Sequence, residues 1–283
     1  MTSPLNALLF GGCMIHWPLM RTSCADGKLV LDAYGPVREI HTFGEMFQII
    51  DVLKGAKVVP QEYRDLAHMR PKLCPVPDAG DFGALDVALL EPASPVELEF
   101  RGVAVNRFAV NRFVRALIGK DNAEAKKLSA KWMRQGLIGL DETVRAGTAT
   151  KLLMHASDDS EDAELARAVI RETRAFPSDI SGGFRKMQAL LGCPVGVALY
   201  VFRYMPDGRA ISWPSGFRET VLSAAQDLSL PIFDPVPLVV TYGVEKALEP
   251  PLAHYSKEFL PVAGDALVDF VRSVHTRSKS PVA

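Results

Sequence analysis

Short apolar runs of strand length alternate along the chain with stretches whose apolar positions recur at helical spacing. Apolar runs without polar alternation are typical of strands buried on both faces of a parallel sheet, which the intervening helices would cover. The pattern therefore predicts an α/β protein of the three-layer α/β/α type, with a mostly parallel central sheet. The expected buried strands span 5–10, 85–90, 195–202 and 231–234.

The segments between these strands predict helices and one strand of a different kind. Residues 96–100 alternate with a period of two, which predicts a half-exposed edge strand. Residues 106–147 are rich in Ala, Leu, Lys and Arg and predict a helical insert that can roof a site at the strand ends. We expect a single domain over 1–283 that includes this insert. The other expected helices span 43–53, 160–176, 179–191, 217–228 and 265–271.

Composition and charge exclude several classes of protein. The 283 residues are 48% hydrophobic, and 32 Lys and Arg oppose 33 Asp and Glu, which gives a net charge of −1. Such a balance provides no field for nucleic acid or an anionic membrane, so neither is expected as a partner. No segment approaches the ~20 apolar residues that span a bilayer. The N-terminus lacks the charged and apolar regions of a signal peptide, so a cytoplasmic protein is predicted.

The cysteines and glycines carry no cofactor motif. The four cysteines make no C-x-x-C pair, which predicts reduced thiols rather than a zinc ribbon or redox motif. Neither G-x-G-x-x-G nor a P-loop occurs, so no nucleotide cradle of those types is expected. We therefore expect no cofactor. The cysteines are Cys13, Cys24, Cys74 and Cys193.

The turn that follows the first expected strand is the most informative feature. Gly11 and Gly12 let the backbone bend sharply and expose its amides, so the side chain of Cys13 can point out over the strand end. A thiol near exposed amides favours its thiolate form, which makes Cys13 a candidate nucleophile. A small residue packed beneath a tight turn is the alternative. Trp17, just beyond the turn, is a candidate wall of a sugar or acyl pocket.

A histidine near the other end of the chain is the candidate base. His254 lies on the predicted loop before the last helix and can reach the end of a central first strand. Glu249 is the carboxylate that precedes it most closely. A surface histidine without a catalytic role is the alternative.

Together the two ends resemble the SGNH, or GDSL-type, hydrolase superfamily. The turn Phe10-Gly11-Gly12-Cys13-Met14 is similar to branches that read Gly-Ser-Cys or Gly-Asn-Cys, namely GSCFA-type proteins and polysaccharide-acetyltransferase-like proteins. The resemblance implies a three-layer α/β/α fold that hydrolyses esters or transfers acyl groups. It also implies Cys13 as nucleophile, His254 as base, and amides around Gly12 and Cys13 as oxyanion donors.

The chain departs from the superfamily pattern at two places. The acid that normally lies three residues before the histidine is replaced by Pro251, which leaves Glu249 as the candidate orienting acid. No asparagine follows the third conserved strand, where Glu91 stands instead, so Asn106 is the candidate side-chain oxyanion donor. An asparagine in a turn or at a helix cap is the alternative. If Gly12 occupies the serine position, no nucleophile remains, and the chain is a binding protein without catalysis.

The expected substrate is a carbohydrate or another small molecule, and acyl transfer would add an acyl donor as a second partner. The arginines near the expected site are suited to an anionic group such as a phosphate or carboxylate, with solvated arginines on a helix face as the alternative. A third alternative is a metal site, because Cys13 and His16 are spaced as two ligands, but no second pair completes it and no metal is expected. The candidate substrate-binding residues are Trp17, His16, Glu91 and Arg107.

Overall fold

The computed structural model describes residues 4–27, 29–31, 40–69, 85–118, 122–155 and 161–279. Their contacts group into two compact units. Unit 1 comprises 1–56, 72–95 and 179–283, and unit 2 comprises 57–71 and 96–178. The expectation of a single domain over 1–283 stays a prediction.

A parallel five-stranded sheet forms the centre of unit 1. Its strand order is β10-β7-β3-β1-β2, and every neighbouring pair is parallel. This confirms the predicted sheet and places the carboxyl ends of its strands at one edge. The strands are β1 (Leu5–Phe10), β2 (Leu29–Leu31), β3 (Val87–Leu90), β7 (Val195–Ala198) and β10 (Ile232–Phe233).

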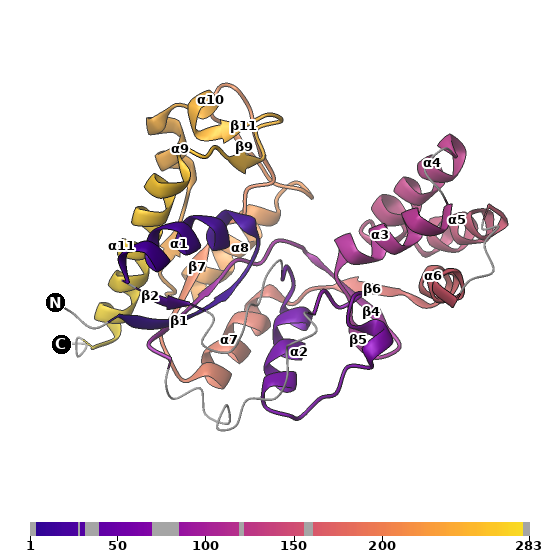
Figure 1. Cartoon of the computed structure of the whole chain (residues 1–283), viewed down its shortest axis with the longest axis horizontal. Helices are drawn as coiled ribbons and strands as arrows, with labels where there is room; N and C mark the ends of the chain where they lie inside the picture. The colour runs from indigo at the N-terminus through magenta and orange to yellow at the C-terminus, as the bar shows by residue number, and fades with distance from the viewer. Residues whose placement is uncertain are drawn as a thin grey trace. The chain divides into compact units, whose positions relative to one another are not determined.

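Helices cover both faces of this sheet, as predicted (Figure 1). On one face, α1 (Cys13–Asp26) and α11 (Leu260–Lys279) bury apolar side chains against the alternate strand residues that include Leu9 and Leu89. On the other face lie α2 (Phe43–Leu53) and α7 (Ile180–Leu191), with α8 (Phe217–Asp227) packed beside α7. The predicted three-layer α/β/α fold is thus confirmed.

Smaller elements follow the sheet near the C-terminal end of unit 1. They pack around Tyr204, Tyr255 and Phe259 in a second apolar cluster, which also takes in Met14 of α1. This cluster holds the last small strands against the start of α1. The elements are β8 (Arg203–Tyr204), β9 (Ala210–Ile211), α9 (Val236–Tyr242), α10 (Val244–Ala247), β11 (Leu248–Glu249) and β12 (His254–Tyr255).

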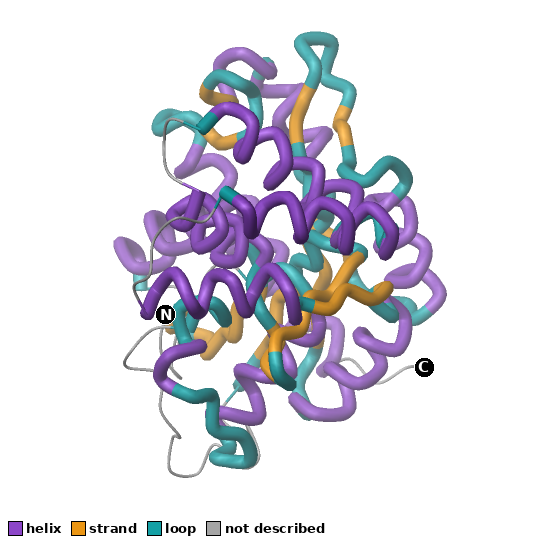
Figure 2. Tube along the Cα trace, turned by 90° about the vertical axis from the view of Figure 1, so that its right-hand side faces the viewer, coloured by secondary structure: helices purple, strands orange, loops and turns teal. Residues whose placement is uncertain are grey.

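Unit 2 combines a small antiparallel sheet with helices. The sheet has the order β5-β4-β6. A single turn of 3-10 helix at Gln61–Tyr63 precedes it in the chain, and a π-helical turn at Trp132–Leu137 separates two of the helices. Over all the described residues of the chain, helix predominates over strand (Figure 2). The elements are β4 (Val96–Phe100), β5 (Val103–Ala104), α3 (Arg107–Ile118), α4 (Ala123–Lys131), α5 (Glu142–Met154), α6 (Glu161–Glu172) and β6 (Arg174–Pro177).

Two expectations for this region were wrong. The strand at 96–100 is the middle strand of its sheet, because β5 pairs with one side of it and β6 with the other. The helix expected over 160–176 ends at Glu172, and Arg174–Pro177 forms β6. The physical reason is the ladder between β4 and β6, a contact between segments that are distant in the chain.

Two boundaries in unit 1 also differ from the expected ones. The strand expected over 195–202 stops at Ala198, and the last helix extends from Leu260 to Lys279 rather than over 265–271. Among the described residues, no helix is both long and apolar enough to cross a membrane.

Candidate active site

Two glycines place Cys13 at the point where β1 passes into α1. Gly12 is extended, with φ −94° and ψ −167°, and Cys13 is the first residue of the helix. A Cβ at Gly11 would lie 2.6 Å from the Cβ of Glu91 and 2.7 Å from Ile15 Cδ1. Only glycine fits there, because real Cβ atoms do not approach other carbons this closely. The half-buried thiol therefore stands at the carboxyl edge of the sheet and at the positive end of a helix.

His254 reaches the thiol from the other end of the chain. Its Nδ1 lies 3.4 Å from Cys13 Sγ, although 241 residues separate the two in sequence. This distance is within hydrogen-bond range for sulfur, so a proton can pass between the two groups. The structure thus brings the predicted nucleophile and the predicted base together.

Trp17 flanks the histidine ring. It lies one helical turn after Cys13 on α1, so the two side chains share a face of the helix. Its ring stacks on His254 with centroids 6.4 Å apart and an angle of 26° between the planes. Because Trp17 is 49% exposed, it presents a free aromatic surface beside the thiol.

An open hollow of about 420 Å³ adjoins this pair. Its wall combines apolar side chains with two exposed cations and one exposed carboxylate. Most of these residues were not predicted from the sequence, although the helical spacing of Met20 and Arg21 from Cys13 is a signal for those two. The lining residues are Trp17, Met20, Arg21, Glu249, Tyr255, Lys257 and Leu260.

Glu249, the predicted orienting acid, lies directly across from His254. The two are paired in the antiparallel ladder of β11 and β12, and side chains opposite each other in such a ladder point to the same side. No described residue makes a carboxylate hydrogen bond to the His254 ring. The orienting role of Glu249 therefore stays a prediction. It requires the Glu249 side chain to rotate until its carboxylate contacts the His254 ring.

Glu91 lies beneath the glycine turn rather than in the open hollow. It directly follows β3, and its Oε2 accepts a hydrogen bond of 2.7 Å from the Gly12 amide. The side chain is only 1% exposed, and burial raises its pKa to about 8 against the opposing effect of the Gly12 hydrogen bond. At neutral pH the carboxyl group is thus mostly protonated. The role of Glu91 as a substrate contact stays a prediction, and the Gly12 amide, a predicted oxyanion donor, donates to Glu91 in this structure.

The remaining predicted residues are buried. His16 is 2% exposed, so in this conformation it offers little surface to a substrate. Asn106 accepts hydrogen bonds from the amides of Phe108 and Ala109, at 2.9 and 3.3 Å, and so caps α3. Arg107 lies with its guanidinium 4.7 Å from the Phe108 ring centre. Because Asn106 and Arg107 belong to unit 2, their roles at the Cys13 site stay predictions.

The described residues contain no group of three or more His, Cys, Asp or Glu side chains that could hold a metal ion. Cys13 and His16 are therefore not joined by a further described ligand. The thiol of Cys13 and the imidazole of His254 are the two reactive groups that the structure brings together here.

Comparison with protein families gives a match over nearly the whole chain. The model of the TviD N-terminal domain matches residues 5–270. No curated protein gave a significant match. The matched segment includes both Cys13 and His254, and with it the whole central sheet of unit 1. The chain therefore belongs to the TviD N-terminal domain family.

Proposed function

We propose that this protein transfers or hydrolyses acyl groups on a carbohydrate or other small substrate, with Cys13 as nucleophile and His254 as base. The observation that carries the proposal is the 3.4 Å approach of Sγ to Nδ1. The family supports it at a coarser level, because the matched model is the N-terminal domain of the Vi antigen O-acetyltransferase TviD, which suggests an acyltransferase-like role. The proposal includes the SGNH-type arrangement of the site.

The first chemical step forms a thioester. His254 Nδ1 takes the proton of Cys13, and the sulfur attacks the acyl carbonyl carbon of a donor ester or thioester. The tetrahedral intermediate then collapses, breaks the bond to the leaving group, and returns the proton from His254 to that group. Cys13 is left as an acyl-enzyme.

The second step releases the acyl group to an acceptor. His254 removes a proton from an acceptor hydroxyl, or from water in hydrolysis, as the oxygen attacks the thioester carbon. Collapse breaks the carbon–sulfur bond, and the thiolate regains its proton from His254. The positive end of the α1 dipole at Cys13 favours both the thiolate and the developing oxyanion. An exposed Trp17 face beside the thiol suits a sugar ring or an acyl chain.

Acylation of Cys13 by a simple activated ester tests this proposal. The protein is incubated with p-nitrophenyl acetate, and peptide mass mapping locates the acetyl group on the four cysteines. We expect Cys13 to be acetylated first, and the rate to fall at least about a hundredfold in His254→Ala, the usual range for loss of a general base.

Cys193 serves as the internal control, because burial raises the pKa of its thiol to about 11. It should remain unmodified at pH 7, in wild type and in Cys13→Ala alike. Equal acetylation of Cys13 in wild type and in His254→Ala, or no acetylation of Cys13 at all, would overturn the proposed chemistry.

A non-catalytic binding protein on the same fold is the second candidate. The occupied Gly12 amide favours it, because this amide is not available to an oxyanion while Glu91 holds it. In that case Cys13 would show the reactivity of an ordinary thiol, and the Trp17 hollow would bind a ligand without turning it over.

A further inference from the structure

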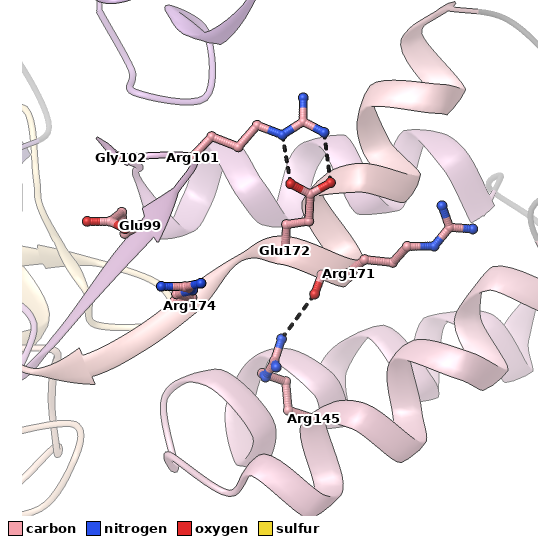
Figure 3. A pocket seen from close by; sticks show the side chains of 7 residues that line it. All are labelled: Glu99, Arg101, Gly102, Arg145, Arg171, Glu172 and Arg174. Carbon is pink, nitrogen blue, oxygen red and sulfur yellow. Dashed lines mark hydrogen bonds and ion pairs between the residues drawn. The ribbon is translucent and has the colours of Figure 1, made fainter.

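Two adjoining hollows on unit 2 share the side chains of Arg145 and Arg174. The larger has a volume of about 520 Å³ and the smaller about 360 Å³, both within the size range of small-molecule sites. Six of the seven residues around the larger hollow are charged (Figure 3). They are Glu99, Arg101, Arg145, Arg171, Glu172 and Arg174, with Gly102 as the seventh.

Arg101 is fixed in place by its partners. Its Nε and Nη2 each donate to the Glu172 carboxylate over 2.7 Å, and its Nη1 donates to the Tyr63 hydroxyl over 3.0 Å. Arg101 has a φ of 50° in the turn between β4 and β5, a left-handed conformation that costs a non-glycine residue about 1 kcal/mol or more. The turn nevertheless carries the large side chain of Arg101, and this side chain forms one edge of the hollow.

Arg145 fixes the opposite edge. Its Nε and Nη2 bind the two carboxylate oxygens of Glu142, and its Nη1 donates to the carbonyl of Thr173 at 3.1 Å and that of Arg171 at 3.4 Å. These carbonyls lie at the end of α6, so Arg145 joins α5 to the chain that leads into β6 (Figure 3). Two of the four arginines therefore serve mainly to hold the walls.

The other two arginines keep their donors available. Within the described part of the chain, the side chains of Arg171 and Arg174 make no hydrogen bond or ion pair. Both residues are exposed. Glu99 pairs with Arg174 across the β4–β6 ladder, and Glu172 is engaged by Arg101. Glu142, which pairs with Arg145, brings the acids to three, so the four arginines leave one uncompensated positive charge.

The smaller hollow supplies a surface of the opposite kind. Phe176 is 40% exposed there, and Leu140 is exposed beside it. Exposed apolar side chains of this size next to unpaired arginines indicate a wall for a ligand with both an anionic and an apolar part. Arg174 borders both hollows and so lies where these two parts would meet.

We propose that this double hollow, defined by the residues around Arg174, binds a small organic oxyanion. A phosphate or carboxylate group of the ligand contacts the guanidinium group of Arg174, whose planar donors match either anion. A flat apolar part of the ligand lies along Phe176. The site belongs to unit 2 and requires neither Cys13 nor His254.

Calorimetric titration of the full chain with three probes tests this site. Phenyl phosphate carries both features, benzoate replaces the phosphate by a carboxylate, and pyrophosphate lacks the ring. We expect saturable binding of phenyl phosphate or benzoate, and the tighter of the two identifies the anion. Arg174→Ala should weaken that probe at least about tenfold. Phe176→Ala should weaken it too, but should leave the affinity for pyrophosphate unchanged.

Arg115→Ala is the matched control, because Arg115 is an exposed arginine on α3 that borders neither hollow. Circular dichroism verifies that each variant is folded. The site is disproved if no probe binds saturably at millimolar concentration, or if Arg115→Ala weakens binding as much as Arg174→Ala. An unchanged affinity of Phe176→Ala for phenyl phosphate or benzoate overturns the apolar wall. Cys13→Ala should bind like wild type, which separates this test from that of the proposed function.

Discussion

Glu91 joins the glycine turn to the central sheet through a buried carboxyl group. Its hydrogen bond to the Gly12 amide and its contact with Gly11 leave no room for a larger residue in the turn. Mostly protonated at neutral pH, the group adds no negative charge behind the Cys13 thiol. A buried anion there would instead disfavour the thiolate.

Stability should depend on pH through this residue. Burial raises the pKa of Glu91 from 4.5 to about 8. The stability that the protonated carboxyl group gives the folded state is therefore fully present below pH 4.5 and is lost as the pH rises through about 8. Glutamine at position 91 cannot titrate, so Glu91→Gln lacks this pH dependence. The difference in free energy of unfolding, wild type minus variant, should therefore fall between pH 4.5 and about 8, by on the order of a few kcal/mol. Denaturant unfolding at pH 5, 7 and 9 measures it.

The control for this prediction is Glu124→Gln, which changes an exposed glutamate in the first turn of α4. Its difference from wild type should not follow the Glu91 window. A Glu91→Gln difference that is constant from pH 5 to 9 would contradict the prediction.

At the residue scale, the sequence indicated the parts of the site that rest on local signals. Cys13 follows a buried strand and a glycine pair, and His254 precedes the final helix, so both could be predicted from neighbouring residues. The position of Glu91 beneath the turn could not, because it depends on the register Phe10–Leu90 between strands about eighty residues apart. Asn106 lies just before α3 and caps it. Its local sequence signal is that of a helix cap, and its role as an oxyanion donor stays a prediction.

At the element scale, α2 begins with a complete capping box. Thr42 accepts from the Glu45 amide with its hydroxyl oxygen at 3.3 Å, and the Glu45 carboxylate accepts from the Thr42 amide at 2.9 Å. These bonds satisfy amides that the first turn of the helix leaves without partners. The helix is thereby held against the sheet at a defined start.

Thr42→Ala should lower the free energy of unfolding by about 1–2 kcal/mol, because it removes one half of this box. Thr150→Ala is the control, since Thr150 lies exposed inside α5 and bonds only to the carbonyl one turn earlier. Its effect should remain within about 0.5 kcal/mol. Denaturant unfolding compares the two, and equal losses would contradict the importance of the box.

Helix α7 packs so closely on α2 that it requires a glycine. A Cβ at Gly183 would overlap the ring of Phe43, which itself packs edge to face on Phe184 at 5.1 Å. Gly183→Ala should therefore destabilise the protein by about 1–3 kcal/mol. The same change at Gly147, in α5, meets open space and should stabilise by about 0.5–1 kcal/mol. Thermal unfolding gives both signs, and a stabilising Gly183→Ala would refute the contact.

Element boundaries followed from the sequence where a local stop signal exists. Helix α7 begins after its capping residue Asp179 and ends at Gly192 in the left-handed conformation, close to the expected limits. The strand β6 carries no such signal: its four residues continue from α6, and only pairing with β4 makes them a strand. Contacts between distant segments decided against the local propensity there.

At the scale of the whole molecule, the chain divides its apolar side chains between two cores. Unit 1 has its core around the parallel sheet, and the fully buried side chains of unit 2 include Phe100, Trp132 and Leu152. The first core was predicted by continuous apolar runs of strand length that alternate along the chain with helical stretches. The grouping of 57–71 with 96–178 could not be predicted from hydrophobic periodicity, because it joins segments that are separated in the chain.

A cavity in the core of one unit should increase local unfolding in that unit before it affects the other. Leu152→Ala is expected to cost about 2–5 kcal/mol, since Leu152 is fully buried. Hydrogen exchange should then quicken in the amides of α3, α5 and α6, while those of β1 and β3 keep their protection. Leu9→Ala in the parallel sheet is the reciprocal control. Equal acceleration in both units would show that they unfold as one.

The two reacting groups are also separated in time during synthesis. The ribosome completes Cys13 first and adds His254 241 residues later, at about 5–20 residues per second, so the thiol spends on the order of ten to fifty seconds without its base. In that interval the nascent chain carries only an ordinary cysteine. Assembly of the proposed site thus requires β12, which follows all five strands of the parallel sheet in the chain, so any acyl-transfer chemistry begins only after that sheet has been synthesised.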